Sequence, residues 1–213
     1  MNYIENIFLC LSIPLLVTLL CTSRKRRTTL LFLLGGMTVC LCSAYVSTFF
    51  VVIMGAETVA AVSNITPMVE ETMKLLPVLF YLLVFEPPRE EAMGAILMTA
   101  AGFATFENAC YLTTNGASNF TWLLIRGAGS GAMHIVCGML LGLGLNALWN
   151  VAWLKTAGTV AMLCFVIIYH AIYNLLVSQQ GTAAVIGYLL PLLTVVSLLP
   201  LGQRFRQRFA PEK

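Results

Sequence analysis

The stretch Met68–Phe85, MVEETMKLLPVLFYLLVF, is mostly apolar but contains two carboxylates and an ammonium, at Glu70, Glu71 and Lys74. Together with the apolar residues that precede it from position 58, it is long enough to cross a bilayer, which takes about 20 helical residues. An ionisable side chain at membrane depth costs roughly 2.5–3.5 kcal/mol on insertion scales. The stretch therefore predicts a membrane helix whose charged groups face other protein groups or a watery cavity rather than lipid.

The composition of the whole chain is that of a membrane protein. Of 213 residues, 59% are hydrophobic and 10% are charged, and the mean hydropathy is +0.88, whereas about 25% of residues are charged in soluble domains. Seven apolar segments are long enough to span, at 4–22, 29–54, 58–85, 92–112, 120–149, 157–177 and 182–201. We expect an all-α, polytopic membrane helix bundle in the cell membrane, with 1–213 as a single domain, a motif-bearing core at about 58–177 and no nucleic-acid partner.

The basic residues predict an orientation, because cytoplasmic loops carry an excess of Lys and Arg. With seven spans, the loops 23–28, 86–91 and 150–156 and the tail after 201 share one side of the membrane. These segments hold ten of the twelve cations: Arg24, Lys25, Arg26, Arg27, Arg89, Lys155, Arg204, Arg206, Arg208 and Lys213. We therefore expect the amino terminus outside and the carboxyl terminus inside.

The polar residues that are candidates for a functional site lie within four consecutive predicted spans, the third to the sixth. They are Glu70, Glu71, Lys74, Glu107, Asn108, Arg126, His134, His170 and Asn174. A rise of about 1.5 Å per residue places most of them between the midplane and the outer leaflet. We expect them to face one another in this layer.

Glutamates and histidines in one layer suit hydrolysis inside the membrane. A carboxylate and an imidazole can activate water and protonate a leaving amine. Two histidines and a carboxylate can also hold a catalytic zinc ion, and His134, His170 and Glu107 are the candidate ligands. The chain has no HExxH or GxSxG motif and no aspartate, so the zincin, serine and aspartyl classes of protease have no support.

The motifs also follow a recognisable order. EExxK at 70–74 precedes GFATFEN at 102–108, followed by Arg126 with His134 and by HxxxN at 170–174. Over about 66–176 this order resembles the PrsW family of intramembrane proteases, which is similar in turn to the CAAX prenyl protease and ABI superfamily. The resemblance implies cleavage of membrane-anchored proteins, such as anti-sigma factors, at the outer side of a bacterial cytoplasmic membrane.

The resemblance also implies roles for single residues. Glu70 and Glu71 match the catalytic glutamate pair and His134 an essential histidine, whereas His170 and Asn174 match the pair that positions water and stabilises the oxyanion. Glu107 stands where the CAAX enzymes have histidine, which leaves open whether the site uses a metal. Supporting roles fall to three further residues, Lys74, Asn108 and Arg126.

Two other functional classes remain open from the residues alone. One is a transporter or channel whose buried glutamates and histidines relay protons or bind a cation, and the other is a membrane scaffold without catalysis. For Arg126 we expect a polar position at the outer end of a water path, which would run along the small residues of 127–132 to His134.

Overall fold

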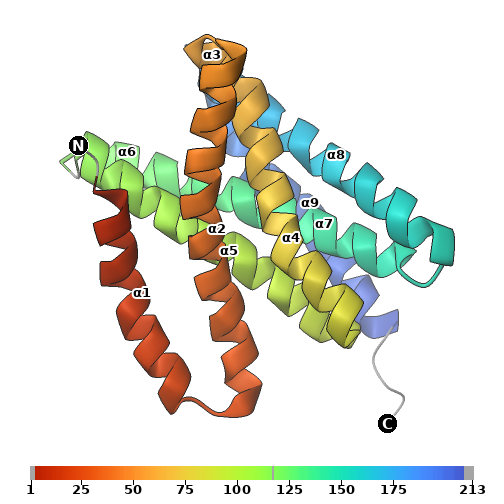
Figure 1. The fold of residues 1–213 in the computed structure, drawn as a ribbon. Helices are drawn as coiled ribbons and strands as arrows, with labels where there is room; N and C mark the ends of the chain where they lie inside the picture. The colour runs from red at the N-terminus through yellow and green to blue at the C-terminus, as the bar shows by residue number, and fades with distance from the viewer. Residues whose placement is uncertain (1–2, 117, 209–213) are drawn as a thin grey trace.

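The computed structural model describes residues 3–116 and 118–208, which form helices and contain no strand (Figure 1). In chain order the elements are α1 (Ile4–Cys21), α2 (Arg24–Met54), α3 (Thr58–Ala60), η1 (Ala61–Ile65), α4 (Thr66–Phe85), α5 (Arg89–Asn115), α6 (Phe120–Ile125), η2 (Arg126–Gly131), α7 (Ala132–Leu148), α8 (Ala152–Val177) and α9 (Thr182–Arg208). The elements η1 and η2 are π-helical turns within the continuous helices 58–85 and 120–148. Seven helices therefore correspond to the seven segments expected from the sequence, and the all-α class is confirmed.

Turn residues end the helices where the hydropathy breaks. Gly55 follows α2 with φ of 58°, and Gly181 precedes α9 with φ of 67°; both values lie in the left-handed region that glycine adopts without steric cost. Between α4 and α5 the chain passes through Pro87 and Pro88, and neither proline has an N–H group to continue a helix. Short connections of this kind make consecutive helices antiparallel neighbours.

Four helical segments are long and apolar enough to cross a membrane by themselves: Ile4–Cys21, Arg26–Met54, Phe120–Leu148 and Ala152–Val177. A shorter apolar segment, Thr182–Leu198, lies in α9. The helices α4 and α5 also pack within the bundle, but their sequences are less apolar. Helix α4 carries the buried charges Glu70, Glu71 and Lys74, and helix α5 begins with charged residues. The protein is thus a membrane helix bundle; the orientation stays a prediction, and Lys213 lies outside the described residues.

Small residues let the helices approach closely. A Cβ atom on Gly36 in α2 would collide with the backbone oxygen of Thr99 in α5, and one on Gly102 would collide with that of Leu33. In α7, Gly138 and Gly142 face Ile96 of α5. Such backbone contacts are how membrane helices associate without a hydrophobic driving force.

Two apolar clusters result from this packing. One joins α4, α5, α7 and α8 and includes Val78, Met133 and Val166. The other joins α2 and α5 around Met37, Phe103 and Phe106, and the side chains of α1 pack on its edge. Figure 1 shows α1 at the periphery, beside α2. The polar residues of the candidate site lie where the two clusters meet.

Candidate active site

The polar residues expected to converge do so, between α4, α5, α7 and α8. Glu70, Glu71 and Lys74 come from α4, and the other site residues come one or two from each helix. His134 is fully buried, and His170 is 2% exposed. Glu107 and Arg126, nearer the end of the bundle, retain 17% and 18% exposure of their side chains. The site is therefore an enclosed polar layer with a partly open outer edge.

Glu71 is bound by two partners in this layer. Its Oε1 atom accepts a hydrogen bond from Lys74 Nζ at 2.7 Å and lies 2.7 Å from Nδ1 of His170. Because a carboxylate only accepts, the proton of the His170 ring lies on Nδ1. The Nε2 atom of His170 then carries a lone pair.

Both nitrogens of His134 have neighbours. Nδ1 lies 3.0 Å from Lys74 Nζ, and Nε2 lies 3.0 Å from Oε2 of Glu107. An ammonium only donates, so Nδ1 is the acceptor and Nε2 carries the proton that it donates to Glu107. The ring also packs against Phe103, with a centroid distance of 4.9 Å.

Arg126 holds Glu107 at the outer edge of the layer. Its Nη2 atom lies 2.7 Å from Glu107 Oε2, its Nε atom donates to Asn108 Oδ1 at 3.1 Å, and its guanidinium stacks 3.6 Å from the centroid of the Tyr111 ring. Ser130 Oγ is a further donor to Glu107, at 3.5 Å. Arg126 therefore braces α5 against η2.

Glu70 differs from all the other carboxylates in the layer. Its Oε2 atom is buried and accepts no hydrogen bond from any described residue. The nearest basic atom is Nε2 of His170, at 3.9 Å, which is too far for a hydrogen bond. A buried acceptor without a partner is costly, so the gap between these two atoms is suited to a water molecule or a cation.

The donor set around this gap fits a metal ion. One ligand atom each from Glu70, His134 and His170 lies within 4.8 Å of the others. Zinc binds oxygen and imidazole nitrogen at about 2.0–2.2 Å in tetrahedral geometry, which separates two ligand atoms by about 3.4 Å. Glu70 Oε2 and His170 Nε2, at 3.9 Å, would have to approach by about 0.5 Å to bind one ion. The bond from His170 Nδ1 to Glu71 is the carboxylate–histidine arrangement that orients metal-binding imidazoles.

The carboxylate ligand in the structure differs from the one that the sequence predicts. Glu107 was the expected carboxylate, whereas the structure groups Glu70 with the two histidines. The physical reason is that Glu107 Oε2 already receives the Arg126 guanidinium and the ring proton of His134. Glu70 Oε2 has neither.

Asn174 uses its amide group to hold two helices together. Its Nδ2 atom donates to the backbone oxygen of Val62 at 3.0 Å, and Val62 lies within the π-helical turn η1. A π turn interrupts the regular hydrogen-bond ladder of a helix and often lies at a functional site. Asn174 thereby fastens α8 to the turn that leads into Glu70.

The path expected along 127–132 begins at exposed residues, Gly127 and Ala128, and is packed beyond them. Gly129, Ser130 and Gly131 are buried, and a Cβ atom on Gly129 would touch the Tyr173 hydroxyl, while one on Gly131 would touch Asn108. An open water path along this face as far as His134 is therefore not seen, because Tyr173 and Asn108 fill the room beside Gly129 and Gly131; access of water to the site from this side stays a prediction.

Sequence reasoning missed the two π turns and the role of Ser130. Each π turn directly precedes a site helix and ends about one turn before a site residue, η1 before Glu70 in α4 and η2 before His134 in α7. The run of small residues in 127–132 is the only sequence signal near η2, and η1 has none that we recognise. Ser130 lies one turn before His134, a spacing that places both on one helix face.

The comparisons agree with this geometry. The family model described as PrsW family intramembrane metalloprotease matches residues 24–201, a range that contains every helix of the site and begins after α1. No curated protein and no solved structure matches the chain. The family match covers far more than half of the chain, so the protein belongs to the PrsW family of intramembrane metalloproteases.

Proposed function

We propose that this protein hydrolyses peptide bonds of membrane-anchored proteins with a water molecule held between Glu70 and His170. The carrying observation is the 3.9 Å gap between Glu70 Oε2 and His170 Nε2. Glu70 Oε2 is buried there and accepts no hydrogen bond from any described residue. A water in this gap reaches both atoms at ordinary hydrogen-bond distances.

Glu70 acts as the general base in this proposal. Its carboxylate takes a proton from the attacking water and returns it to the leaving amine, which is the usual cycle of a glutamate in peptide hydrolysis. Glu71 serves differently, because Lys74 and His170 both bind its Oε1 atom. It holds the His170 ring so that the Nε2 lone pair points toward the gap.

A zinc ion is supported by the family description and by the fit of Glu70, His134 and His170 as ligands. When bound there, it supplies Lewis-acid polarisation of the scissile carbonyl. A carboxylate has two oxygens, so ligation through one leaves the other to accept a proton. Glu71 and Glu107 then act as the outer carboxylates that orient the two imidazoles.

The site lies deep in the bundle, which determines where a substrate is cut. Glu70 is twelve residues from the start of the continuous helix 58–85 and fifteen from its end, or about 18 and 22 Å. With the amino terminus outside, this corresponds to the outer-to-middle layer of the membrane. We propose anti-sigma factors with one membrane anchor, in a bacterial cytoplasmic membrane, as the substrate class.

The test is cleavage of a single-pass reporter protein by purified enzyme in proteoliposomes. Glu70→Gln keeps the shape of the side chain and removes its basicity, and we expect a loss of at least about a hundredfold in rate. Glu57→Gln is the matched control, since Glu57 is an exposed carboxylate before α3. Cleavage by Glu70→Gln at the wild-type rate would refute the assignment, and ion flux through the same vesicles would favour a transporter instead.

The zinc part has a separate readout. We expect elemental analysis of the active preparation to find about one zinc per chain, and a chelator to remove both the zinc and the activity. A fully active preparation without metal would overturn the zinc assignment and would support hydrolysis by Glu70 as general base without a metal ion.

A further inference from the structure

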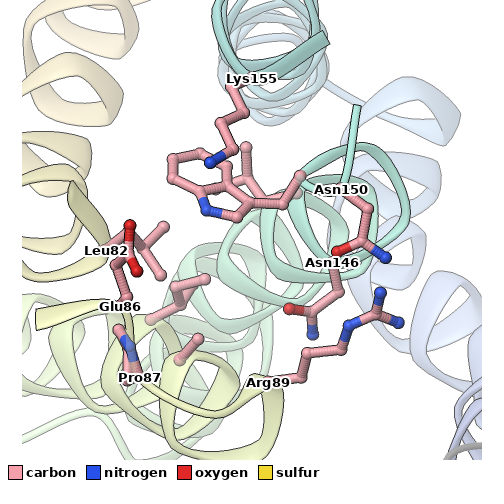
Figure 2. Close-up of a pocket in the computed structure, with 11 residues that line it drawn as sticks. Leu82, Glu86, Pro87, Arg89, Asn146, Asn150 and Lys155 are labelled. Atoms are coloured by element: carbon pink, nitrogen blue, oxygen red, sulfur yellow. The ribbon is translucent and has the colours of Figure 1, made fainter. Parts of the chain in front are cut away.

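A cavity of about 460 Å³, lined by both polar and apolar side chains, lies at the end of the bundle opposite the π turns. It is bordered by the α4–α5 connection and the α7–α8 connection, and the side chains that matter for binding are Glu86, Arg89, Asn146, Trp149, Asn150 and Lys155. Its volume falls in the range of small-molecule sites, about 300–1,000 Å³. Figure 2 shows the Lys155 ammonium pointing into the space between Glu86 on one side and Arg89, Asn146 and Asn150 on the other.

This cavity is separate from the active site. Leu82 at its floor is eleven residues beyond Glu71 in α4, and Asn146 is twelve residues beyond His134 in α7. At 1.5 Å per residue these separations are about 17 and 18 Å along the helices. The cavity therefore lies at the end of the bundle formed by the connections around 86–88 and 149–151, which the basic residues predict to be the cytoplasmic end.

The polar groups of the cavity have unused hydrogen-bonding capacity. Within the described part of the chain, the side-chain amides of Asn146 and Asn150 form no hydrogen bond, and Lys155 forms no ion pair. The Lys155 ammonium lies 5.8 Å from the centroid of the Trp149 ring, which fixes its direction without occupying its three N–H groups. The cavity therefore presents several donors to a ligand with acceptor oxygens.

The charge and the floor of the cavity define the ligand further. The Lys155 ammonium brings a positive charge that forms no ion pair within the described residues, and Glu86 lies on the other side of the cavity, so an anion can pair with Lys155. The floor is apolar, formed by Leu82, Ile96 and Leu145. Basic pockets between membrane helices on the cytoplasmic side suit anionic headgroups, and tryptophan is enriched at that level of the bilayer.

We propose that this cavity binds the phosphodiester headgroup of an anionic phospholipid, of the phosphatidylglycerol type. The phosphate monoanion pairs with the Lys155 ammonium, the asparagine amides also donate to its oxygens, and Glu86 accepts from a headgroup hydroxyl. The apolar floor receives the glycerol backbone and the start of the acyl chains. This inference does not depend on the proposed hydrolysis.

A lipid in this position would join the helices that form the active site. The cavity is lined from α4, α5, α7 and α8, the same four helices that carry Glu70, Glu107, His134 and His170. Its floor residues Leu82, Ile96 and Leu145 belong to the apolar cluster that also contains Met133, next to His134. Binding therefore stabilises the arrangement of the catalytic helices from the opposite end.

The experiment compares ligands on detergent-purified full-length protein, with thermal unfolding and native mass spectrometry as readouts. The ligands are phosphatidylglycerol, phosphatidylcholine and the soluble headgroup glycerophosphoglycerol. We expect phosphatidylglycerol to raise the unfolding temperature and to remain bound in the spectrometer, whereas the other two have little effect. An equal effect of the soluble headgroup would show that the natural ligand is a free phosphate ester and not a lipid. An equal effect of phosphatidylcholine would show that the cavity does not recognise the charge of the headgroup. Either result overturns the proposal.

Two variants that remove one positive charge each make the test specific. Lys155→Gln removes the cation that points into the cavity, and we expect the dissociation constant for phosphatidylglycerol to rise about tenfold, which is about 1.4 kcal/mol. Arg26→Gln removes an exposed cation from the first turn of α2, which is expected on the same side of the membrane, and should leave the constant unchanged. Equal weakening in both variants would mean diffuse attraction to the surface and would overturn the site. Lys155→Arg keeps the charge and should keep the binding.

Discussion

Lys74 Nζ lies 3.0 Å from Nδ1 of His134, at the nitrogen of that ring that carries the lone pair. The same ammonium donates to Glu71 Oε1 at 2.7 Å and lies 4.8 Å from the centroid of the Phe103 ring. A lysine thus occupies a position at which a metal ion would meet His134. Its charge balances part of the negative charge of the glutamates and also opposes a second cation nearby.

The first prediction follows from this competition for His134. In wild type, zinc must displace the Lys74 ammonium from Nδ1 of His134, and the ammonium also repels the ion. Lys74→Met removes both costs, so we expect it to bind zinc at least about tenfold more tightly than wild type does. Titration of purified protein against a chelating dye measures this affinity. Lys74→Arg keeps the positive charge and should bind zinc no more tightly than wild type; unchanged affinity in Lys74→Met would show that the lysine does not compete.

The second prediction separates the two adjacent glutamates. Glu70→Gln alters a carboxylate oxygen that has no hydrogen-bond partner among the residues that the structure describes, so we expect cleavage to be lost while the unfolding temperature stays within a few degrees of wild type. Glu71→Gln disrupts a buried ion pair and the bond to His170, and breaking such a buried pair costs about 3–5 kcal/mol. We expect Glu71→Gln to lose both activity and stability. Equal stability of the two variants would contradict the different roles assigned to them.

The third prediction concerns Asn174, for which the family resemblance implies oxyanion stabilisation. The structure engages its Nδ2 atom with the backbone oxygen of Val62, which makes it a positioning residue. We expect Asn174→Ala to unfold at a lower temperature, with a loss of about 1 kcal/mol, and to keep kcat within about tenfold of wild type. Removing an oxyanion donor costs about 100- to 1,000-fold in kcat, so a loss of that size without lower stability would restore the oxyanion role.

The fourth prediction uses two neighbouring glycines of α2. A Cβ atom on Gly36 would collide with the backbone of α5, whereas Gly35 has nothing within 4 Å. We expect Gly36→Ala to lower the free energy of unfolding by about 1–3 kcal/mol, the usual cost of overpacking, because backbone atoms cannot rotate away. Gly35→Ala, the control, should be neutral or slightly stabilising, as alanine is the better helix former. Thermal unfolding in detergent compares the two.

Sequence patterns predicted the helices better than their ends. The expected spans 92–112 and 157–177 correspond to α5, which begins at Arg89, and to α8, which begins at Ala152. The first helical turns of α5 and α8 lie outside the expected spans, because they contain charged residues such as Glu90 and Lys155. These turns continue the helix beyond the apolar segment that hydropathy detects. Hydrogen bonding along the backbone decides the end of a helix, and hydropathy reports only the part that faces lipid or the core.

The site shows the same limit at the level of single atoms. Convergence of the glutamates and histidines follows from the cost of isolated charges in a membrane, and this could be predicted. Which carboxylate faces the histidine pair depends on the rotation of each helix, and a π turn inserts one residue and shifts that rotation by about 100°. Since η1 precedes Glu70 and η2 precedes His134, a regular helical wheel does not distinguish Glu70 from Glu107 as the third ligand.

The last prediction tests the orientation, on which the depth of the site and the leaflet of the lipid cavity both depend. Gln180, between α8 and α9, and Val151, between α7 and α8, are exposed connection residues at opposite ends of α8. In a background with the seven native cysteines replaced, we expect Gln180→Cys to react with a membrane-impermeant thiol reagent on intact cells and Val151→Cys to react only after the cells are opened. The reason is the ten cations assigned to the side of Val151, since positively charged loops remain in the cytoplasm. The reverse pattern would place the amino terminus inside, and it would move both the cleavage layer and the lipid cavity to the other half of the membrane.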